Sequence, residues 1–166
     1  MAAETNVRLD GVKILPGQWR NFAGAKTLYR VAGERRFNIL LPEDIGRKMA
    51  EDGWLIKWLE PRDDQDPLMA RLEVKVMFGQ YPPNINILKP GKRIRLSEAN
   101  VGILDTAVIT EADVIIRPYN WMVNGKSGVA AYLVSLFAHV QVDELEEKYS
   151  SYGVDYESEG PDGYDA

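Results

Sequence analysis

Cysteine is absent from this 166-residue sequence, and histidine occurs once, as His139. Without cysteine the chain has no disulfide, no thiolate nucleophile and no cysteine-ligated zinc or iron–sulfur site. A single histidine cannot build a two-histidine metal site, and His139 lies in an apolar run where a structural role is the simpler interpretation. No run approaches the roughly 18 apolar residues of a membrane helix, and residues 1–8 lack the apolar segment of a secretory signal. We therefore expect a soluble, cytoplasmic protein with no metal, no cofactor and no membrane partner.

Basic residues are almost absent from the C-terminal end. Residues 142–166 contain nine acidic residues and a single base, Lys148, which gives this segment a net charge of −8. The first 141 residues contain 19 bases and 16 acids, a net charge of +3, although the whole chain carries −5. A mildly basic body with an acidic end remains compatible with a nucleic-acid partner, which a uniformly acidic protein would repel.

Short β-rich runs separated by turn-forming residues dominate the sequence. In the clearest of them, Leu72 and Val74 alternate with Glu73 and Lys75, so one face is apolar and the other charged. Strands are expected over 12–15, 27–31, 36–41, 54–59, 68–78, 84–88, 112–119 and 129–142, the main helix over 43–52, and short helices near 97–104 and 143–149.

About eight short strands with regular turn signals predict a mainly β single domain over 1–149. Because closure removes exposed strand edges, we favour a partly open Greek-key barrel like the oligonucleotide-binding (OB) fold, elaborated by extra hairpins, over a β-sandwich. Beyond residue 149, acids and turn-forming residues dominate, and that segment cannot bury enough apolar surface to offset its ordering entropy. A flexible acidic tail is therefore expected over 150–166.

Two motifs suggest catalysis or metal binding but have simpler interpretations. The sequence at 125–127 resembles part of a phosphate-binding loop, yet Asn120 stands where that loop has glycine, and a β-patterned run follows instead of a helix. A loop that presents Lys126 to a phosphate backbone, or a solvated hairpin turn, fits better. Asp63, Asp64 and Asp66 offer oxygen ligands for a divalent cation, but they lack EF-hand spacing and a polar turn is the simpler interpretation.

Bases interleaved with aromatic residues are the strongest functional signal. Binding a single nucleic-acid strand requires cations for the phosphates and flat side chains on which bases stack. Arg117, Tyr119 and Trp121 are spaced two residues apart, so a strand that continues through Pro118 presents all three on one face. The candidate contacts are Trp19, Arg20, Phe22, Lys26, Tyr29, Arg30, Arg35, Arg36, Phe37, Lys57, Trp58, Arg71, Lys75, Lys92, Arg93, Arg95, Arg117, Tyr119, Trp121 and Lys126.

The last 18 residues contain five acids and no base. A flexible segment of this length has a root-mean-square reach of about 20–25 Å, enough to cross a small domain and compete with nucleic acid for a basic groove. It could equally bind a basic partner protein, or serve only as a solubilising end. The candidate partner-binding residues are Asp155, Tyr156, Glu157, Glu159, Asp162, Tyr164 and Asp165.

The block 114–121, followed by 123–129 and by Asp143-Glu144-Leu145, resembles the single-stranded DNA (ssDNA)-binding proteins of bacteriophage replication. Shorter matching pieces extend the resemblance over about residues 10–150; they are 21–24, 36–38, 52–54 with Lys57, 59–62 and 72–83. The resemblance implies an OB-fold core, ssDNA binding with little sequence preference, no catalysis, and action in the bacterial cytoplasm. It also implies DNA contacts by Arg117, Trp121 and Lys126.

The same resemblance implies an acidic tail that contacts phage or host replication and recombination proteins. Better-known tails of this kind end in an aromatic residue, whereas this chain ends Tyr164-Asp165-Ala166, so Tyr164 would have to take that role. Two other functions remain open from the residues alone. One is a non-catalytic interaction module, such as a virion component or an inhibitor of a host nuclease. The other is a metal-dependent nuclease that uses Asp63, Asp64 and Asp66.

Overall fold

The computed structural model describes residues 5–26 and 32–141. Within them no helix is both long and apolar enough to cross a membrane. The elements in chain order are β1 (Val7–Ile14), η1 (Gly17–Trp19), β2 (Arg20–Asn21), β3 (Arg35–Pro42), α1 (Glu43–Glu51), β4 (Ile56–Leu59), β5 (Met69–Val76), β6 (Asn84–Lys89), β7 (Lys92–Leu96), η2 (Val101–Asp105), β8 (Ile109–Val123) and β9 (Lys126–Val140).

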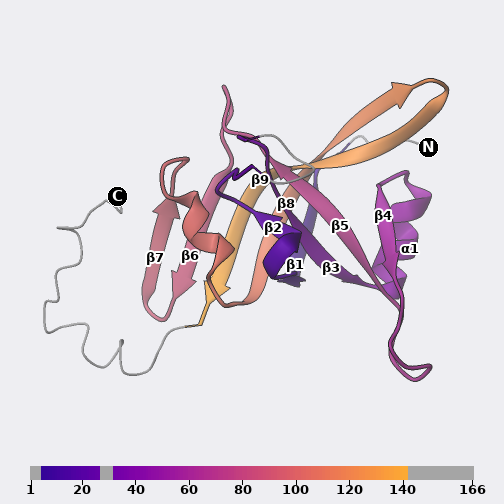
Figure 1. Cartoon of the computed structure of the whole chain (residues 1–166), viewed down its shortest axis with the longest axis horizontal. Coiled ribbons are helices and arrows are strands. Elements are labelled where there is room, and N and C mark those ends of the chain that lie inside the picture. Colours follow the sequence, from indigo (N-terminus) through magenta and orange to yellow (C-terminus); the bar gives the residue numbers. More distant parts are fainter. Residues whose placement is uncertain (1–4, 27–31, 142–166) are drawn as a thin grey trace, which may run out of the picture.

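Five strands close into a ring in the order β1-β3-β5-β9-β8 and back to β1 (Figure 1). All of these pairings are antiparallel except β5–β9, which is parallel and covers only Val74↔Ala131 and Lys75↔Tyr132. The short closing pair makes this a partly open barrel with the strand arrangement of the OB fold. The expected fold class is therefore confirmed, and the β-sandwich alternative is wrong.

The interior of the barrel is formed by the alternate apolar residues of these strands. The burial of β5 follows the alternation of its sequence, with Ala70, Leu72, Val74 and Val76 inside and the charged residues between them outside. At one end of the barrel, Phe22 and Phe37 stack with ring centroids 4.9 Å apart, and both are 0% exposed.

The α1 helix follows β3 directly and packs beside β4 and β5 (Figure 1). Glu43 and Asp44 lie in its first turn and Lys48 in its last, which complements the helix dipole at both ends. Gly46 faces β4, and a Cβ atom at this position would lie 3.1 Å from the Trp58 ring. The predicted helix 43–52 is thus confirmed to within one residue.

The longest element is the β8–β9 hairpin, whose two 15-residue strands project well beyond the barrel (Figure 1). Its turn is only Asn124 and Gly125, both with positive φ (52° and 78°), which is the conformation that a tight two-residue hairpin requires. The expectation of a longer loop between strands ending at 119 and starting at 129 is wrong. An Asn-Gly pair turns the chain in two residues, so the residues on either side continue the ladder.

The remaining elements flank the ring. Strands β6 and β7 form a hairpin whose inner strand, β6, runs parallel to β9, and β7 was not expected from the sequence. The expected helix at 97–104 is a 3₁₀ helix, η2. The expected strand 27–31, the helix 143–149 and the acidic tail 150–166 lie outside the described residues.

Candidate nucleic-acid interface

Four side chains form a row across the outside of the barrel. Arg36 of β3 pairs with Lys75 of β5, Lys75 with Tyr132 of β9, and Tyr132 with Arg117 of β8. Because successive side chains of a strand point to opposite faces, this row is external while its neighbours, such as Val74, face the core. The row thus brings three cations and one aromatic ring together from four strands.

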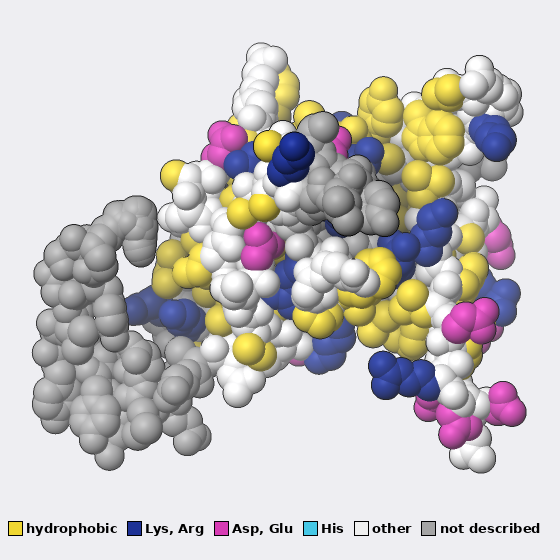
Figure 2. Space-filling view, in the orientation of Figure 1, with side chains coloured by type: hydrophobic (Ala, Val, Ile, Leu, Met, Phe, Trp, Pro, Cys, Tyr) yellow, Lys and Arg dark blue, Asp and Glu magenta, His cyan; other side chains and the backbone are white. Residues whose placement is uncertain are grey.

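The aromatic part of this surface continues along the projecting hairpin. Tyr119 and Trp121 follow Arg117 at intervals of two residues, so the three share a face, as the sequence predicts. The Tyr119 and Tyr132 rings lie 5.5 Å apart, and the Arg117 guanidinium carbon lies 5.1 Å from the Tyr132 centroid. Tyr119 remains 50% exposed. Figure 2 shows hydrophobic side chains gathered over this hairpin, with Lys and Arg side chains below them toward β4 and β5.

Small residues on β9 allow the hairpin rings to lie close to the backbone. Tyr119 is opposite Ala130, and Trp121 is opposite Gly128. A Cβ atom at Gly128 would lie 3.0 Å from Cζ2 of Trp121 and 2.8 Å from Cδ2 of Leu55. The absence of a side chain at Gly128 therefore determines where the Trp121 indole can rest.

A second group lies on the same face of β3, β4 and β5. The Arg71 guanidinium carbon is 4.5 Å from the centroid of the Trp19 ring. Arg71 Nη1 donates a hydrogen bond to Asn38 Oδ1 at 2.9 Å, and Asn38 Nδ2 donates one to the Trp19 carbonyl at 2.9 Å. Lys57 of β4 is directly opposite Arg71 and exposed. These contacts hold Trp19 and Arg71 in fixed positions beside the central row.

A cleft of about 450 Å³ opens beside the central row. Arg36, Lys75 and Tyr132 line it together with Met77 and Phe78, which follow β5. Arg35 and three acidic residues also line it: Glu34, Glu73 and Glu98. Arg36 Nε is buried and has no hydrogen-bond partner in the part of the chain that the structure describes. The cleft therefore combines an unpaired hydrogen-bond donor and apolar surface with side chains of both charges. We call the surface made by Trp19, Arg36, Lys57, Arg71, Lys75, Arg117, Tyr119, Trp121, Lys126 and Tyr132 the basic–aromatic face.

Two of the predicted arginines instead support the fold. Arg20 is buried and donates hydrogen bonds to the carbonyls of Leu15, Leu104 and Ala107. Burial lowers the pKa of Arg20, and the nearby Asp105 carboxylate partly opposes this shift. Arg35 donates from Nε to the Phe22 carbonyl and from Nη1 to Glu98. The Arg20 guanidinium is engaged within the protein, so the expectation that it contacts nucleic acid does not fit its geometry. Arg35 also lines the cleft beside the central row, so its contact with nucleic acid stays a prediction.

Three predicted rings also lie away from the basic–aromatic face. Phe22 and Phe37 form the buried stack inside the barrel, so neither can receive a base, and their assignment as base-stacking residues is corrected on this ground. Trp58 pairs with the inward-facing Ala70 and lies against α1, with the Arg47 guanidinium carbon 5.4 Å from its ring centroid. Its 40% exposed surface therefore belongs to the helix side of β4.

The other predicted residues are scattered. Lys92, Arg93 and Arg95 lie on β7, the strand at the opposite end of the sheet order from β4. Lys26 is exposed at the edge of the first described segment. Lys126, in contrast, is opposite Val123 and so shares the face of the hairpin that carries Trp121. Tyr29, Arg30 and the candidate tail residues lie outside the described residues.

Sequence reasoning missed Tyr132 as a contact residue, although it is central to the row. Tyr132 could be predicted only if the register of the hairpin were known, because a two-residue turn at Asn124 and Gly125 places Tyr132 opposite Arg117. Leu55 was missed as well. It is 40% exposed and reaches the hairpin because its backbone N–H donates to the Val129 carbonyl at 3.0 Å.

The aspartate cluster forms a turn. The Asp66 N–H donates to the Asp63 carbonyl at 2.9 Å, and the Gln65 N–H donates to Asp63 Oδ1 at 3.1 Å. Over residues 5–26 and 32–141, no group of three or more His, Asp and Glu side chains is arranged to hold a metal ion. The simpler interpretation of Asp63, Asp64 and Asp66 therefore fits the structure.

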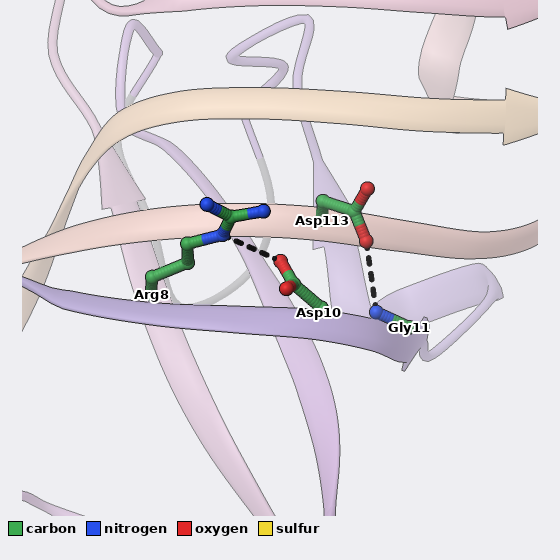
Figure 3. Close-up of polar contacts among 4 residues, drawn as sticks. All are labelled: Arg8, Asp10, Gly11 and Asp113. Atoms are coloured by element: carbon green, nitrogen blue, oxygen red, sulfur yellow. Dashed lines mark hydrogen bonds and ion pairs between the residues drawn. The ribbon is translucent and has the colours of Figure 1, made fainter.

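Acidic side chains gather where β1 bulges against β8, as Figure 3 shows. Gly11, with a φ of 65°, donates its N–H to Asp113 Oδ1 at 2.9 Å across the register shift between Leu9 and Val12. Arg8 Nε donates to Asp10 Oδ1 at 2.9 Å, and this hydrogen bond raises the pKa of Arg8. Asp113 thus links β1 to β8, whereas the exposed Arg8–Asp10 pair lies within β1.

Comparison with known proteins identifies similar folds and the family of the chain. The fold is similar to the single-stranded DNA-binding protein from bacteriophage Enc34 in complex with ssDNA, at 12% identity and a TM-score of 0.56, covering 83% of this chain and 88% of that chain. A second structure of the Enc34 protein gives 12% identity and a TM-score of 0.55, covering 83% and 82%. No curated protein sequence matches the chain. Residues 2–159 match the family model described as "Putative phage ssDNA-binding domain", and because this match spans nearly the whole chain, the protein belongs to that family.

Proposed function

We propose that this protein binds ssDNA across the basic–aromatic face, largely without sequence preference. The observation that carries the proposal is the row formed by Arg36, Lys75, Tyr132 and Arg117, which continues into Tyr119 and Trp121 on the hairpin. Family membership and the Enc34 complex with ssDNA support the same conclusion. On OB folds, the outer face of the second and third barrel strands and the loop between the fourth and fifth bind oligonucleotides, and these correspond here to β3, β5 and the β8–β9 hairpin.

The chemistry follows from the two kinds of side chain on this face. Lys and Arg neutralise phosphates, which are identical at every nucleotide, while the tyrosine and tryptophan rings stack on bases. Every base offers a flat face, so stacking contributes about 1–3 kcal/mol per base with little regard to sequence. Rings already held in place by neighbouring residues, such as Trp19 and Trp121, lose less conformational freedom on binding a base than freely rotating side chains would.

The proposed role is binding without catalysis, in which the protein covers ssDNA during phage replication and recombination in the bacterial cytoplasm. The turn geometry of the aspartate cluster supports this choice over the nuclease alternative. The acidic tail would contact partner proteins or compete with ssDNA. If the tail competes, removal of residues 150–166 should raise ssDNA affinity; an unchanged affinity and salt dependence would argue against competition.

The direct test is titration of a fluorescent oligo-dT with the full chain at two salt concentrations. Binding should be tight at low salt and weaken steeply as salt rises, since phosphate contacts release counterions. A matched pair of variants locates the site. Tyr132→Ala should weaken binding, whereas Lys48→Gln on the exposed side of α1 should leave it unchanged. Absence of binding at low salt by the full chain and by the tail-deleted chain would refute the proposal.

A further inference from the structure

A second basic surface lies on the β6–β7 hairpin, away from the basic–aromatic face. It consists of Lys89, Lys92, Arg93 and Arg95. The hairpin pairs Lys89 with Lys92, while Arg93 and Arg95 share the other face of β7. The three β7 residues are exposed, and no described residue forms an ion pair with any of the four. Four cations on a short hairpin, with no ion-pair partner among residues 5–26 and 32–141, repel one another, so this surface favours an acidic ligand.

The end of β9 lies beside this surface. Strands β6 and β9 run parallel and side by side (Figure 1). Leu88 is opposite His139, so Lys89 is level with Val140. A shallow hollow of about 710 Å³ is lined by Lys89, Lys92 and Arg93 and, from the neighbouring strands, by Thr110, His139 and Val140. The Gln141 N–H donates to the Val108 carbonyl at 2.8 Å and fixes the direction in which the chain leaves the sheet.

We propose that the acidic segment 143–147 of the same chain docks on this hollow. Four of its five residues are acidic, and the segment begins two residues after Gln141. Two extended residues span about 7 Å, so the first carboxylates arrive beside Lys89 and Lys92 without any rearrangement of the sheet. Because the linker is this short, the local concentration of the acidic segment is high and weak surface ion pairs become sufficient for docking.

Docking gives the β7 cations a role that does not involve ssDNA. The acidic segment would neutralise them and would anchor the tail at the end of the sheet where β6 and β7 lie. Residues 150–166 would then leave from this point, and the rest of the tail would remain available to partners. The inference does not depend on where ssDNA binds, so it can fail while the proposed function holds.

The test is nuclear magnetic resonance of the full-length, ¹⁵N-labelled chain without DNA. In the variant Lys92→Glu/Arg93→Glu, the amide signals of 143–147 should shift toward those seen for the wild type at high salt, where ion pairs are screened. The control Lys48→Glu should leave these signals in place. Charge reversal at Asp143 and Glu144 should shift the β7 amides, and combining both reversals should restore the wild-type pattern at low salt.

Unchanged 143–147 signals in Lys92→Glu/Arg93→Glu would overturn the proposal. The milder Lys92→Gln/Arg93→Gln variant provides the same comparison if charge reversal disturbs the edge strand. Fluorescence titration with oligo-dT identifies the competing occupant. If the glutamine variant loses several-fold in ssDNA affinity while the 143–147 signals do not move, the β7 cations bind ssDNA and the docking proposal is wrong.

Discussion

The double substitution Lys75→Gln/Arg117→Gln tests the basic–aromatic face most quantitatively. These residues flank Tyr132 in the central row, and neither side chain forms an ion pair with another described residue. Six cations lie on this face: Arg36, Lys57, Arg71, Lys75, Arg117 and Lys126. If each neutralises one phosphate, the plot of log K against log salt should have a slope of about −4, since single strands contribute about −0.7 per phosphate.

Removing two of these cations should reduce the slope to about −3 and weaken binding most at low salt. The assay is fluorescence titration of oligo-dT with the full chain at four or more salt concentrations. Lys48→Gln, which removes an exposed charge from α1, serves as the control and should retain the wild-type slope. An unchanged slope in the double variant, with the folded state verified by circular dichroism, would show that the phosphates lie elsewhere and would refute the assignment.

Three further substitutions examine the rings and the core. Tyr132→Ala should cost about 1–3 kcal/mol of ssDNA binding, measured by the same titration, because a stacking platform is lost; a change below twofold would remove Tyr132 from the site. Gly128→Ala should displace the indole of Trp121 and weaken binding roughly fivefold, or about 1 kcal/mol, with little change in Tm; wild-type affinity would show that the indole position is unimportant. Phe22→Ala should reduce the free energy of unfolding by about 3–5 kcal/mol in urea denaturation, as expected for a core ring, and a loss under 1 kcal/mol would contradict its place in the core.

The sequence predicted the fold class because its local signals agree with the tertiary structure. Alternation in β5, the acids that begin α1 and the turn residues between strands all indicate the elements that are observed. The spacing of Arg117, Tyr119 and Trp121 also predicted one face correctly, since a strand places every second residue on the same side.

The contact residues were harder to predict because burial depends on partners far away in the sequence. Trp19 and Phe22 are three residues apart, yet Trp19 packs against Arg71 outside the barrel while Phe22 stacks on Phe37 inside it. Arg20 lies between them, and its sequence position predicts a phosphate contact. In the structure, however, its guanidinium donates hydrogen bonds to backbone carbonyls in and just after η2. No local pattern distinguishes these three positions.

Photocrosslinking with iodouracil-substituted ssDNA, followed by mass spectrometry of the full-length protein, tests the central claim most directly. Crosslinks form at aromatic residues in stacking contact with the substituted base. We expect them to map to Tyr119, Trp121 and Tyr132, with Trp19 as a further site. Crosslinks confined to residues outside the basic–aromatic face, such as the 86% exposed Tyr81, would contradict it.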